Sequence, residues 1–245
     1  MSVADEEVTQ YDVPMAEITV LSLGGSMVVP ERIDIDYLRA FREFIIGYLD
    51  ANPDARLVLV IGGGKPARDY QQALKEIRPE ASSDDLDWTG IYATRLNAGL
   101  VKAVLGEYCV DPIVDDPTSV YRFSGRVLVG AGWKPGFSTD FDAVILAEEF
   151  GASLVINMTN IETVYTADPK LDPNAEPIVR ITWPEFLKLT GDTWTPGKNT
   201  PFDPVAAKHA ATVGLTVVSA HGKNLENLRK ILEGKEYVGT TIVPG

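Results

Sequence analysis

Residues 56–68 read Arg56-Leu57-Val58-Leu59-Val60-Ile61-Gly62-Gly63-Gly64-Lys65-Pro66-Ala67-Arg68. The apolar residues before the glycines favour β structure, which predicts a strand buried on both faces of a sheet. Three consecutive glycines let the backbone turn sharply and expose N–H groups to an anion. Pro66 suits the first position of a helix, whose N-terminus attracts negative charge, and Lys65 and Arg68 add two positive charges there. The stretch predicts a phosphate-binding strand–turn–helix unit, although such turns also occur in α/β proteins without a phosphate.

The composition is that of an ordinary globular protein, with 245 residues of which 45% are hydrophobic and 23% charged. That length suffices for one large α/β domain. The formal net charge of −13 argues against nucleic acid as a partner, so a phosphate site must use local cations, oriented amides and a divalent metal. No apolar run approaches the ~18 residues of a membrane span. Residues 1–16 lack a signal-peptide pattern. We expect a cytoplasmic protein with no membrane partner and a flexible acidic tail over residues 1–16.

Strands and helices alternate along the chain, which predicts a mostly parallel sheet with helices on both faces. Strands are expected near 17–23, 56–61, 109–114, 126–129, 153–157, 215–219 and 237–243. Helices are expected from about 36, 67, 90, 139, 183, 204 and 224, with Ile91, Leu96, Leu100 and Val104 inward in the helix over 90–106. The stretches 78–87 and 163–177 are expected to be irregular, and the loop over 191–203 is long enough for a binding role or a lid.

Three expected strand ends carry glycine turns, at 24–25, 62–64 and 130–136, and a fourth ends in Thr159-Asn160. Because ligands of such sheets bind beyond the carboxyl ends of the strands, we expect these exits to face one crevice. Several anion-binding turns suggest two phosphate-bearing ligands. Phosphoryl transfer between them needs in-line placement and an offset for negative charge, which Lys65, Arg68, backbone amides and Mg²⁺ would supply. The single cysteine, Cys109, gives neither a disulfide nor a metal cluster.

Six motifs follow one another along the chain. They are Ser22-Leu23-Gly24-Gly25-Ser26, Gly62-Gly63-Gly64-Lys65-x-x-Arg68, Asp87-x-x-Gly90-Ile91-x-x-Thr94-Arg95-x-Asn97, Pro135-Gly136-x-x-Thr139-Asp140, Thr159-Asn160-x-x-x-Val164-Tyr165-Thr166-Ala167-Asp168-Pro169 and Asp203-Pro204-x-Ala206-Ala207-Lys208. Their order resembles that of the amino-acid-kinase superfamily, and the chain is most similar to its archaeal-type uridylate kinases. The resemblance covers nearly the whole chain from Glu17. It implies a three-layer αβα sandwich over 17–245, with a UMP half over about 17–150 and an ATP half over about 151–245.

The resemblance further implies conversion of UMP and ATP to UDP and ADP in pyrimidine biosynthesis, with Mg²⁺ carried by ATP, in a homo-oligomer that is typically a hexamer. The apolar helix over 36–50 is a candidate contact between subunits. Carried over by position, the catalytic residues are Lys65, Arg68 and Asp140. The UMP-binding residues are Gly63, Arg68, Asp87, Trp133, Phe137, Ser138 and Thr139, and the ATP-binding residues are Ser22, Gly24, Gly25, Ser26, Gly64, Thr159, Tyr165 and Asp168. No metal site made by the protein alone is implied.

Two departures from the family pattern leave alternatives open. Many members have a lysine where Ser22 stands, which leaves Lys65, Lys134, Lys198, Lys208 or the metal to offset charge. The pair Glu162-Thr163 replaces a usual Asp-Gly, and Thr163 disfavours the positive φ that glycine permits. A non-catalytic relative that stores or senses an anion, as molybdenum storage proteins do, therefore remains an alternative, as does a kinase with another phosphate acceptor. Isopentenyl phosphate kinases have a histidine shortly after the glycines, and residues 65–70 have none.

Overall fold

The computed structural model describes residues 17–119, 122–169, 171–191 and 201–245. The main sheet contains β1 (Ile18–Leu23), β2 (Arg56–Ile61), β3 (Val127–Gly130), β4 (Leu154–Thr159), β7 (Arg180–Thr182), β8 (Thr216–His221) and β9 (Thr240–Val243), and a small ribbon contains β5 (Val164–Tyr165) and β6 (Pro177–Ile178). The α-helices are α1 (Gly25–Val28), α2 (Ile35–Ala51), α3 (Gly64–Ile77), α4 (Ser83–Leu105), α5 (Thr139–Glu149), α6 (Trp183–Thr190), α7 (Pro204–Thr212) and α8 (Leu225–Leu232). The predicted tail over 1–16 and most of the predicted lid over 191–203 lie outside the described residues.

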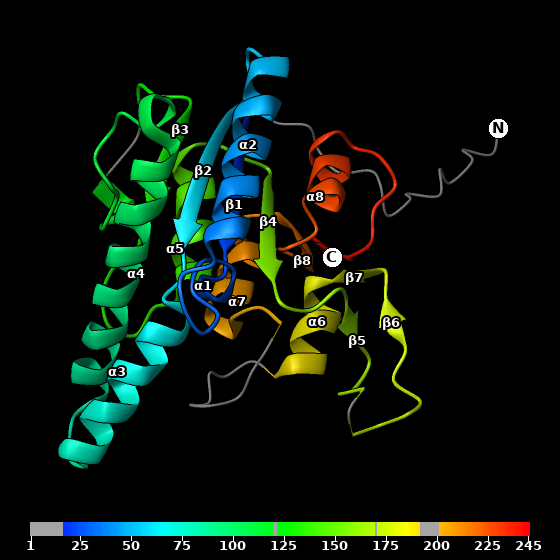
Figure 1. The fold of residues 1–245 in the computed structure, drawn as a ribbon. Coiled ribbons are helices and arrows are strands. Elements are labelled where there is room, and N and C mark those ends of the chain that lie inside the picture. Colours follow the sequence, from blue (N-terminus) through cyan, green and yellow to red (C-terminus); the bar gives the residue numbers. More distant parts are fainter. Residues whose placement is uncertain (1–16, 120–121, 170, 192–200) are drawn as a thin grey trace.

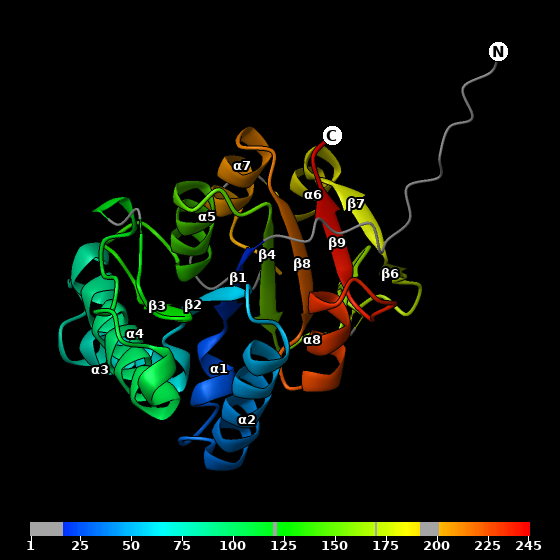
Figure 2. The ribbon, with the colours of Figure 1, turned by 90° about the horizontal axis from the view of Figure 1, so that it is seen from above.

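The main sheet has the strand order β3-β2-β1-β4-β8-β9-β7 (Figure 1). The five strands from β3 to β8 are parallel, and β9 runs antiparallel to β8. Helices α2, α4 and α8 pack on one face of the sheet, and α5, α6 and α7 pack on the other (Figure 2). This arrangement confirms the predicted three-layer sandwich with a mostly parallel sheet.

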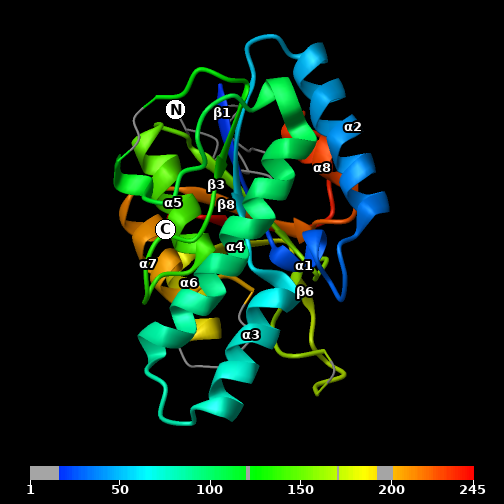
Figure 3. The ribbon, with the colours of Figure 1, turned by 60° about the vertical axis from the view of Figure 1, so that its left-hand side comes forward.

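Strand β2 lies inside the sheet, as its sequence predicts. Residues Leu57–Ile61 are fully buried, with alternate side chains entering the two cores on opposite faces of the sheet. Its neighbour β1 pairs with it in parallel from Ile18–Arg56 to Leu23–Ile61. Because β3, β2, β1 and β4 are adjacent and parallel, the four predicted glycine or polar exits leave the same edge of the sheet. Helix α3 follows the exit of β2 and lies side by side with α4 (Figure 3).

Four local expectations are wrong. Helix α3 begins at Gly64, so Pro66 is its third residue rather than its first. Helix α4 begins at Ser83 within the expected loop, because Ser82 and Asp85 form a capping box. The expected strand over 109–114 is absent from the described chain, where only Val114 forms an isolated bridge, to Gly130. The ends of the stretch 163–177 pair as β5 and β6.

Candidate functional site

The turns that follow β1 and β2 touch backbone to backbone. A Cβ atom on Gly25 would lie 2.0 Å from the Gly64 nitrogen, and one on Gly64 would lie 2.5 Å from the Gly25 oxygen. Gly64 also has a φ of +65°, a conformation that side chains other than glycine rarely adopt. Glycine is therefore required at both positions, and the two turns form one continuous seam, which we define as Gly24–Gly25 and Gly62–Gly64.

Helix α4 fixes this seam through Asn97. The Asn97 side-chain amide donates to the carbonyl oxygens of Gly62, over 2.9 Å, and of Gly63, over 3.0 Å. Within the described ranges, no hydrogen bond engages the N–H groups of Gly63 and Gly64. Asn97 is buried, so its amide would lose free energy without these partners. The side chain thus holds the glycine carbonyls away from the cavity and leaves N–H groups for an anion.

Beside the seam lies a first cavity of about 280 Å³. Its lining includes six of the residues predicted for UMP, namely Gly63, Arg68, Asp87, Phe137, Ser138 and Thr139. Gly64, which was predicted on the ATP side, also lines this cavity. The remaining UMP residue, Trp133, is outside the lining, and its ring packs against that of Phe137 at 5.2 Å. One carboxylate oxygen of Asp87 accepts from the Gly136 N–H over 2.9 Å, which ties α4 to the loop before α5.

A second cavity of about 750 Å³ lies at the exits of β4 and β5. Its lining includes Ser26, Thr159, Tyr165 and Asp168 of the predicted ATP set. Gly24, Gly25 and Ser22 lie outside that lining. Arg68 lines both cavities, whereas Thr139 lines the first and Thr159 the second. Arg68 forms no ion pair with any residue that the structure describes, so its guanidinium group is available where the cavities meet.

Two carboxylates, those of Asp140 and Asp203, lie close in sequence to residues that line the two cavities, although neither lines a cavity itself. Asp140 follows Thr139 of the first cavity, and it accepts hydrogen bonds from the Ser22 hydroxyl over 3.0 Å and from the Asp203 N–H over 3.2 Å. Asp203 caps α7 two residues after Pro201 of the second cavity. Burial raises the pKa of Asp140 to about 6, and the charge of Asp203 adds to the rise while the two hydrogen bonds oppose it.

Comparison with known proteins identifies the family. The model of the Amino acid kinase family matches residues 17–218 of the chain. This chain belongs to the amino acid kinase family. Curated relatives in the family include the uridylate kinases of Methanocorpusculum labreanum, 36% identical over 91% of this chain and 94% of the relative, and of Pyrococcus abyssi, 31% identical over 92% and 99%.

Solved structures agree with this assignment. The uridylate kinase of Archaeoglobus fulgidus superposes with a TM-score of 0.78 at 33% identity, covering 92% of this chain and 99% of that chain. The UMP kinase of Bacillus anthracis superposes with a TM-score of 0.75 at 18% identity, covering 93% of this chain and 96% of that chain. At that identity the likeness supports the fold alone. No helix in the described part of this family member is long and apolar enough to cross a membrane.

Two of the lysines expected to offset charge in place of a lysine at position 22 are engaged by other groups in this amino acid kinase family member. Lys65 Nζ lies 2.6 Å from an Asp69 carboxylate oxygen and 3.8 Å from one of Glu31, and Lys65 lines neither cavity. Lys134 Nζ lies 3.7 Å from the centre of the Trp133 ring. Lys198 is outside the described residues. Lys208 lines neither cavity, whereas Arg68 lines both.

The loop that contains Glu162-Thr163 has no strained backbone at Thr163, although glycine was expected there. Thr163 lines the second cavity, and no described residue other than glycine has a positive φ. The loop therefore turns without the positive φ that a glycine at position 163 would permit. The Thr163 hydroxyl oxygen is buried and has no hydrogen-bond partner among the described residues. The described residues contain no group of three or more His, Cys, Asp or Glu side chains that could hold a metal ion.

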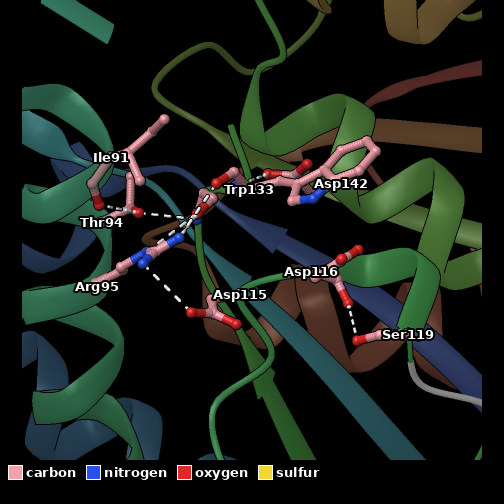
Figure 4. Close-up of polar contacts among 9 residues, drawn as sticks. Ile91, Thr94, Arg95, Asp115, Asp116, Ser119, Trp133 and Asp142 are labelled. Atoms are coloured by element: carbon pink, nitrogen blue, oxygen red, sulfur yellow. Dashed lines mark hydrogen bonds and ion pairs between the residues drawn. The ribbon is translucent and has the colours of Figure 1, made fainter. Parts of the chain in front are cut away.

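Sequence reasoning assigned no role to the polar residues that support the first cavity. Thr94 accepts from the Gly132 N–H over 2.8 Å and donates to the Ile91 carbonyl over 2.6 Å. Figure 4 shows Arg95 and Asp142 reaching the same segment from α4 and α5. Thr94, Arg95 and Asn97 belong to a quoted motif, but nothing local in the sequence reveals partners that lie more than 30 residues away.

Proposed function

We propose that this chain is a nucleoside monophosphate kinase that transfers a phosphoryl group from Mg-ATP to UMP, giving UDP and ADP. The observation that carries the proposal is the placement of Arg68 on the linings of both cavities, beside a glycine seam with free N–H groups. Such a junction offers a cation and oriented amides where two phosphate tails would meet. The relatives named uridylate kinase across nearly the full chain supply the acceptor's identity.

In the first cavity, the proposed acceptor site, Gly63 and Arg68 would bind the phosphate of UMP. Arg68 can grip a phosphate through two parallel hydrogen bonds, which gives direction as well as charge. Asp87 would accept hydrogen bonds from the ribose hydroxyls, because one of its oxygens accepts from Gly136 while the other has no hydrogen-bond partner among the described residues. Phe137, Ser138 and Thr139 would line the base, with Trp133 supporting Phe137 from behind.

In the second cavity, the proposed donor site, Thr159, Tyr165 and Asp168 would bind the nucleoside half of ATP. Tyr165 offers a flat ring to adenine, and Asp168 offers a carboxylate to the ribose hydroxyls. The volume of about 750 Å³ is in the range of small-molecule sites. Ser26 and the seam would face the phosphate chain.

The reaction requires the protein mainly to align two nucleotides and offset charge. Mg²⁺ would enter with ATP and offset charge on the transferred group, and the carboxylates of Asp140 and Asp203 have the oxygen chemistry to hold it. Arg68 would stabilise the same charge from the acceptor side. Ser22 keeps Asp140 oriented by its hydrogen bond and disfavours its protonation. A homo-oligomeric assembly, a cytoplasmic location and the division near residue 150 stay predictions.

A coupled assay of ADP formation tests the function. Purified protein is given Mg-ATP with UMP, CMP or isopentenyl phosphate, and thermal shifts with each compound are measured in parallel. We expect turnover and stabilisation with UMP above the other acceptors. Turnover with another acceptor would instead identify a different kinase of the family. Nucleotide binding without turnover on any acceptor would support the anion-storing alternative.

A further inference from the structure

The segment between β3 and α5 is held at several backbone atoms by side chains from both neighbouring helices. We define the acceptor loop as residues 132–138. The Arg95 guanidinium group donates to the Trp133 carbonyl over 3.1 Å and to the Gly132 carbonyl over 3.4 Å. It also pairs with Asp115 at 3.3 Å (Figure 4). Arg95 thus links α4, the acceptor loop and the chain segment before β3.

Asp142 holds the same loop from the opposite side. Its carboxylate accepts from the Trp133 N–H over 3.2 Å (Figure 4). The side chain is 1% exposed, and its second oxygen has no hydrogen-bond partner among the described residues. A buried carboxylate with only one partner is costly, so its presence needs a reason beyond stability. Trp133 is therefore held through its N–H by α5 and through its carbonyl by α4.

The loop needs such support because its sequence is flexible. Gly132 and Gly136 lie within it, Gly136 has a φ of +86°, and a glycine-rich segment loses more backbone entropy on ordering than other segments do. If the loop is ordered before a ligand arrives, binding no longer has to supply that free energy. Gly132, Phe137 and Ser138 of the loop line the first cavity, so the clamped segment includes or lies within a few residues of that lining.

We propose that Arg95 and Asp142 are positioning residues that pre-order the acceptor loop and thereby set the affinity for the acceptor nucleotide. Neither residue lines either cavity, so neither touches a substrate placed there. The inference rests on the proposed function of the first cavity as the acceptor site. Its effect should fall on the acceptor and not on ATP, because the clamped atoms belong to residues remote from the second cavity's lining.

Arg126 supplies a matched structural control. It also donates from a guanidinium group to backbone carbonyls, those of Leu49, Asn52 and Ala55, but it precedes β3 and lies at the opposite edge of the sheet. Asp142 offers an internal control, because Asp142→Asn keeps an oxygen that can accept from Trp133, whereas Asp142→Leu keeps volume without an acceptor. The variants are Arg95→Gln, Arg126→Gln, Asp142→Asn and Asp142→Leu.

Two measurements are made on each variant. The first is hydrogen exchange of residues 132–138 in the ligand-free protein, and the second is the pair of KM values for UMP and ATP. We expect Arg95→Gln and Asp142→Leu to speed exchange in the loop and to raise the KM for UMP roughly tenfold or more, with the KM for ATP changed less than about twofold. The loop exchange rate and the KM for UMP of Asp142→Asn should lie closer to those of the unchanged protein than the values of Asp142→Leu do. Arg126→Gln should lower the melting temperature without either effect.

The outcomes separate the two proposals. Unchanged loop exchange in Arg95→Gln and Asp142→Leu, or equal rises in both KM values, overturns the positioning role even if UMP is the substrate. If the unchanged protein neither binds nor phosphorylates UMP, the proposed function fails, and the exchange data still show whether the clamp orders the loop. A loss of order in Arg126→Gln equal to that in Arg95→Gln would make Arg95 merely structural.

Discussion

The Ser22 hydroxyl donates a hydrogen bond to the Asp140 carboxylate over 3.0 Å and so joins the end of β1 to the start of α5. Ser22 is buried in the sheet, and Asp140 is next to Thr139 of the first cavity. The bond favours the ionised form of Asp140 against the burial that raises its pKa to about 6. In this chain a neutral hydroxyl therefore stands at the position where a lysine was expected from the family resemblance. This hydroxyl donates a hydrogen bond to a carboxylate, whereas the lysine would offset charge on a phosphate.

Ser22→Ala should move the acidic limb of the kcat profile to higher pH. Removing the hydroxyl takes away a hydrogen bond that lowers the pKa of Asp140, so the carboxylate becomes protonated at a higher pH than about 6. The check is kcat measured from pH 5 to pH 9 at saturating UMP and Mg-ATP. Ser119→Ala serves as the control, because the Ser119 hydroxyl bonds, among the described residues, only the Asp116 carbonyl in an exposed turn. An acidic limb at the same pH in both variants would contradict the role given to Ser22.

Arg68→Ala should reduce kcat/KM for UMP by about 10²–10³, since it removes a charged donor from the place where negative charge is transferred. The KM for UMP should rise far more than the KM for ATP, because Arg68 is proposed to bind the acceptor phosphate. Initial rates with each substrate varied in turn measure both values. Arg68→Lys keeps the charge without the two-pronged geometry and should recover part of the loss. Equal rises in the two KM values would place Arg68 between the phosphates and not on the acceptor's.

Asp87→Ala should weaken UMP binding while leaving the fold intact. The side chain would lose its contact with the ribose hydroxyls and its hydrogen bond to the Gly136 N–H, both at the edge of the first cavity. Calorimetric titration with UMP and a melting curve check the two halves of this prediction. Asp84→Ala is the matched control, because Asp84 lies in the first turn of α4, three residues before Asp87, but outside the cavity lining. A melting temperature that falls sharply in Asp87→Ala alone would make Asp87 a structural residue.

Gly25→Ala should destabilise the fold by about 3 kcal/mol or more and abolish turnover. Its Cβ would collide with the Gly64 nitrogen at 2.0 Å, and neither atom can rotate away, because the nitrogen belongs to the backbone and the position of a Cβ is fixed by its own backbone. Urea unfolding measures the free-energy change. Gly99→Ala provides the comparison, since nothing lies within 4 Å of a Cβ there and the residue is inside α4. The free energy of unfolding of that variant should rise by up to about 1 kcal/mol, because alanine has a higher helix propensity than glycine.

Asp142→Asn should change how stability depends on pH. Burial raises the pKa of Asp142 to about 7 in the folded chain, whereas the unfolded chain releases this proton near the ordinary value of 3.8. Between these values the folded state binds more protons, so the free energy of unfolding falls as pH rises, by at most about 1.4 kcal/mol per pH unit. Asparagine has no proton to lose. The free energy of unfolding of the variant should therefore rise relative to that of the unchanged protein between pH 5 and pH 8. Parallel pH curves from urea unfolding would contradict this.

The sequence predicted those parts of the site that depend on local order along the chain. The unit from Arg56 to Arg68 forms the strand, turn and helix expected of it, and the carboxyl ends of β1 to β4 meet because parallel strands share an edge. Six of the residues predicted for UMP line one cavity, and five of them lie in the segments that follow β2 and β3, whereas Asp87 comes from α4. Which lysine offsets charge could not be predicted, because the pairing of Lys65 with Asp69 and Glu31 depends on side-chain geometry.

Helix α4 shows why the rest was missed. Helical spacing places Leu96 inward, yet it is 74% exposed, while the polar Thr94 and Asn97 are buried. Their partners are backbone groups of Gly132, Gly62 and Gly63, which no pattern within α4 reveals. The expected strand over 109–114 fails for a similar reason, because the Asp111 carboxylate accepts from the Ser124 and Gly125 N–H groups and bends the segment into a loop.

The glycine seam restricts how this enzyme could acquire a new substrate. Its two turns are in direct contact, so, if they hold the two phosphate tails as proposed, a change that shifts one tail would also shift the other. Residues 132–138 are held by side chains from α4 and α5 and not by backbone contact with the seam. Variation among acceptors is therefore open to this protein through replacement of one short connection, with the phosphate-transfer centre left as it is.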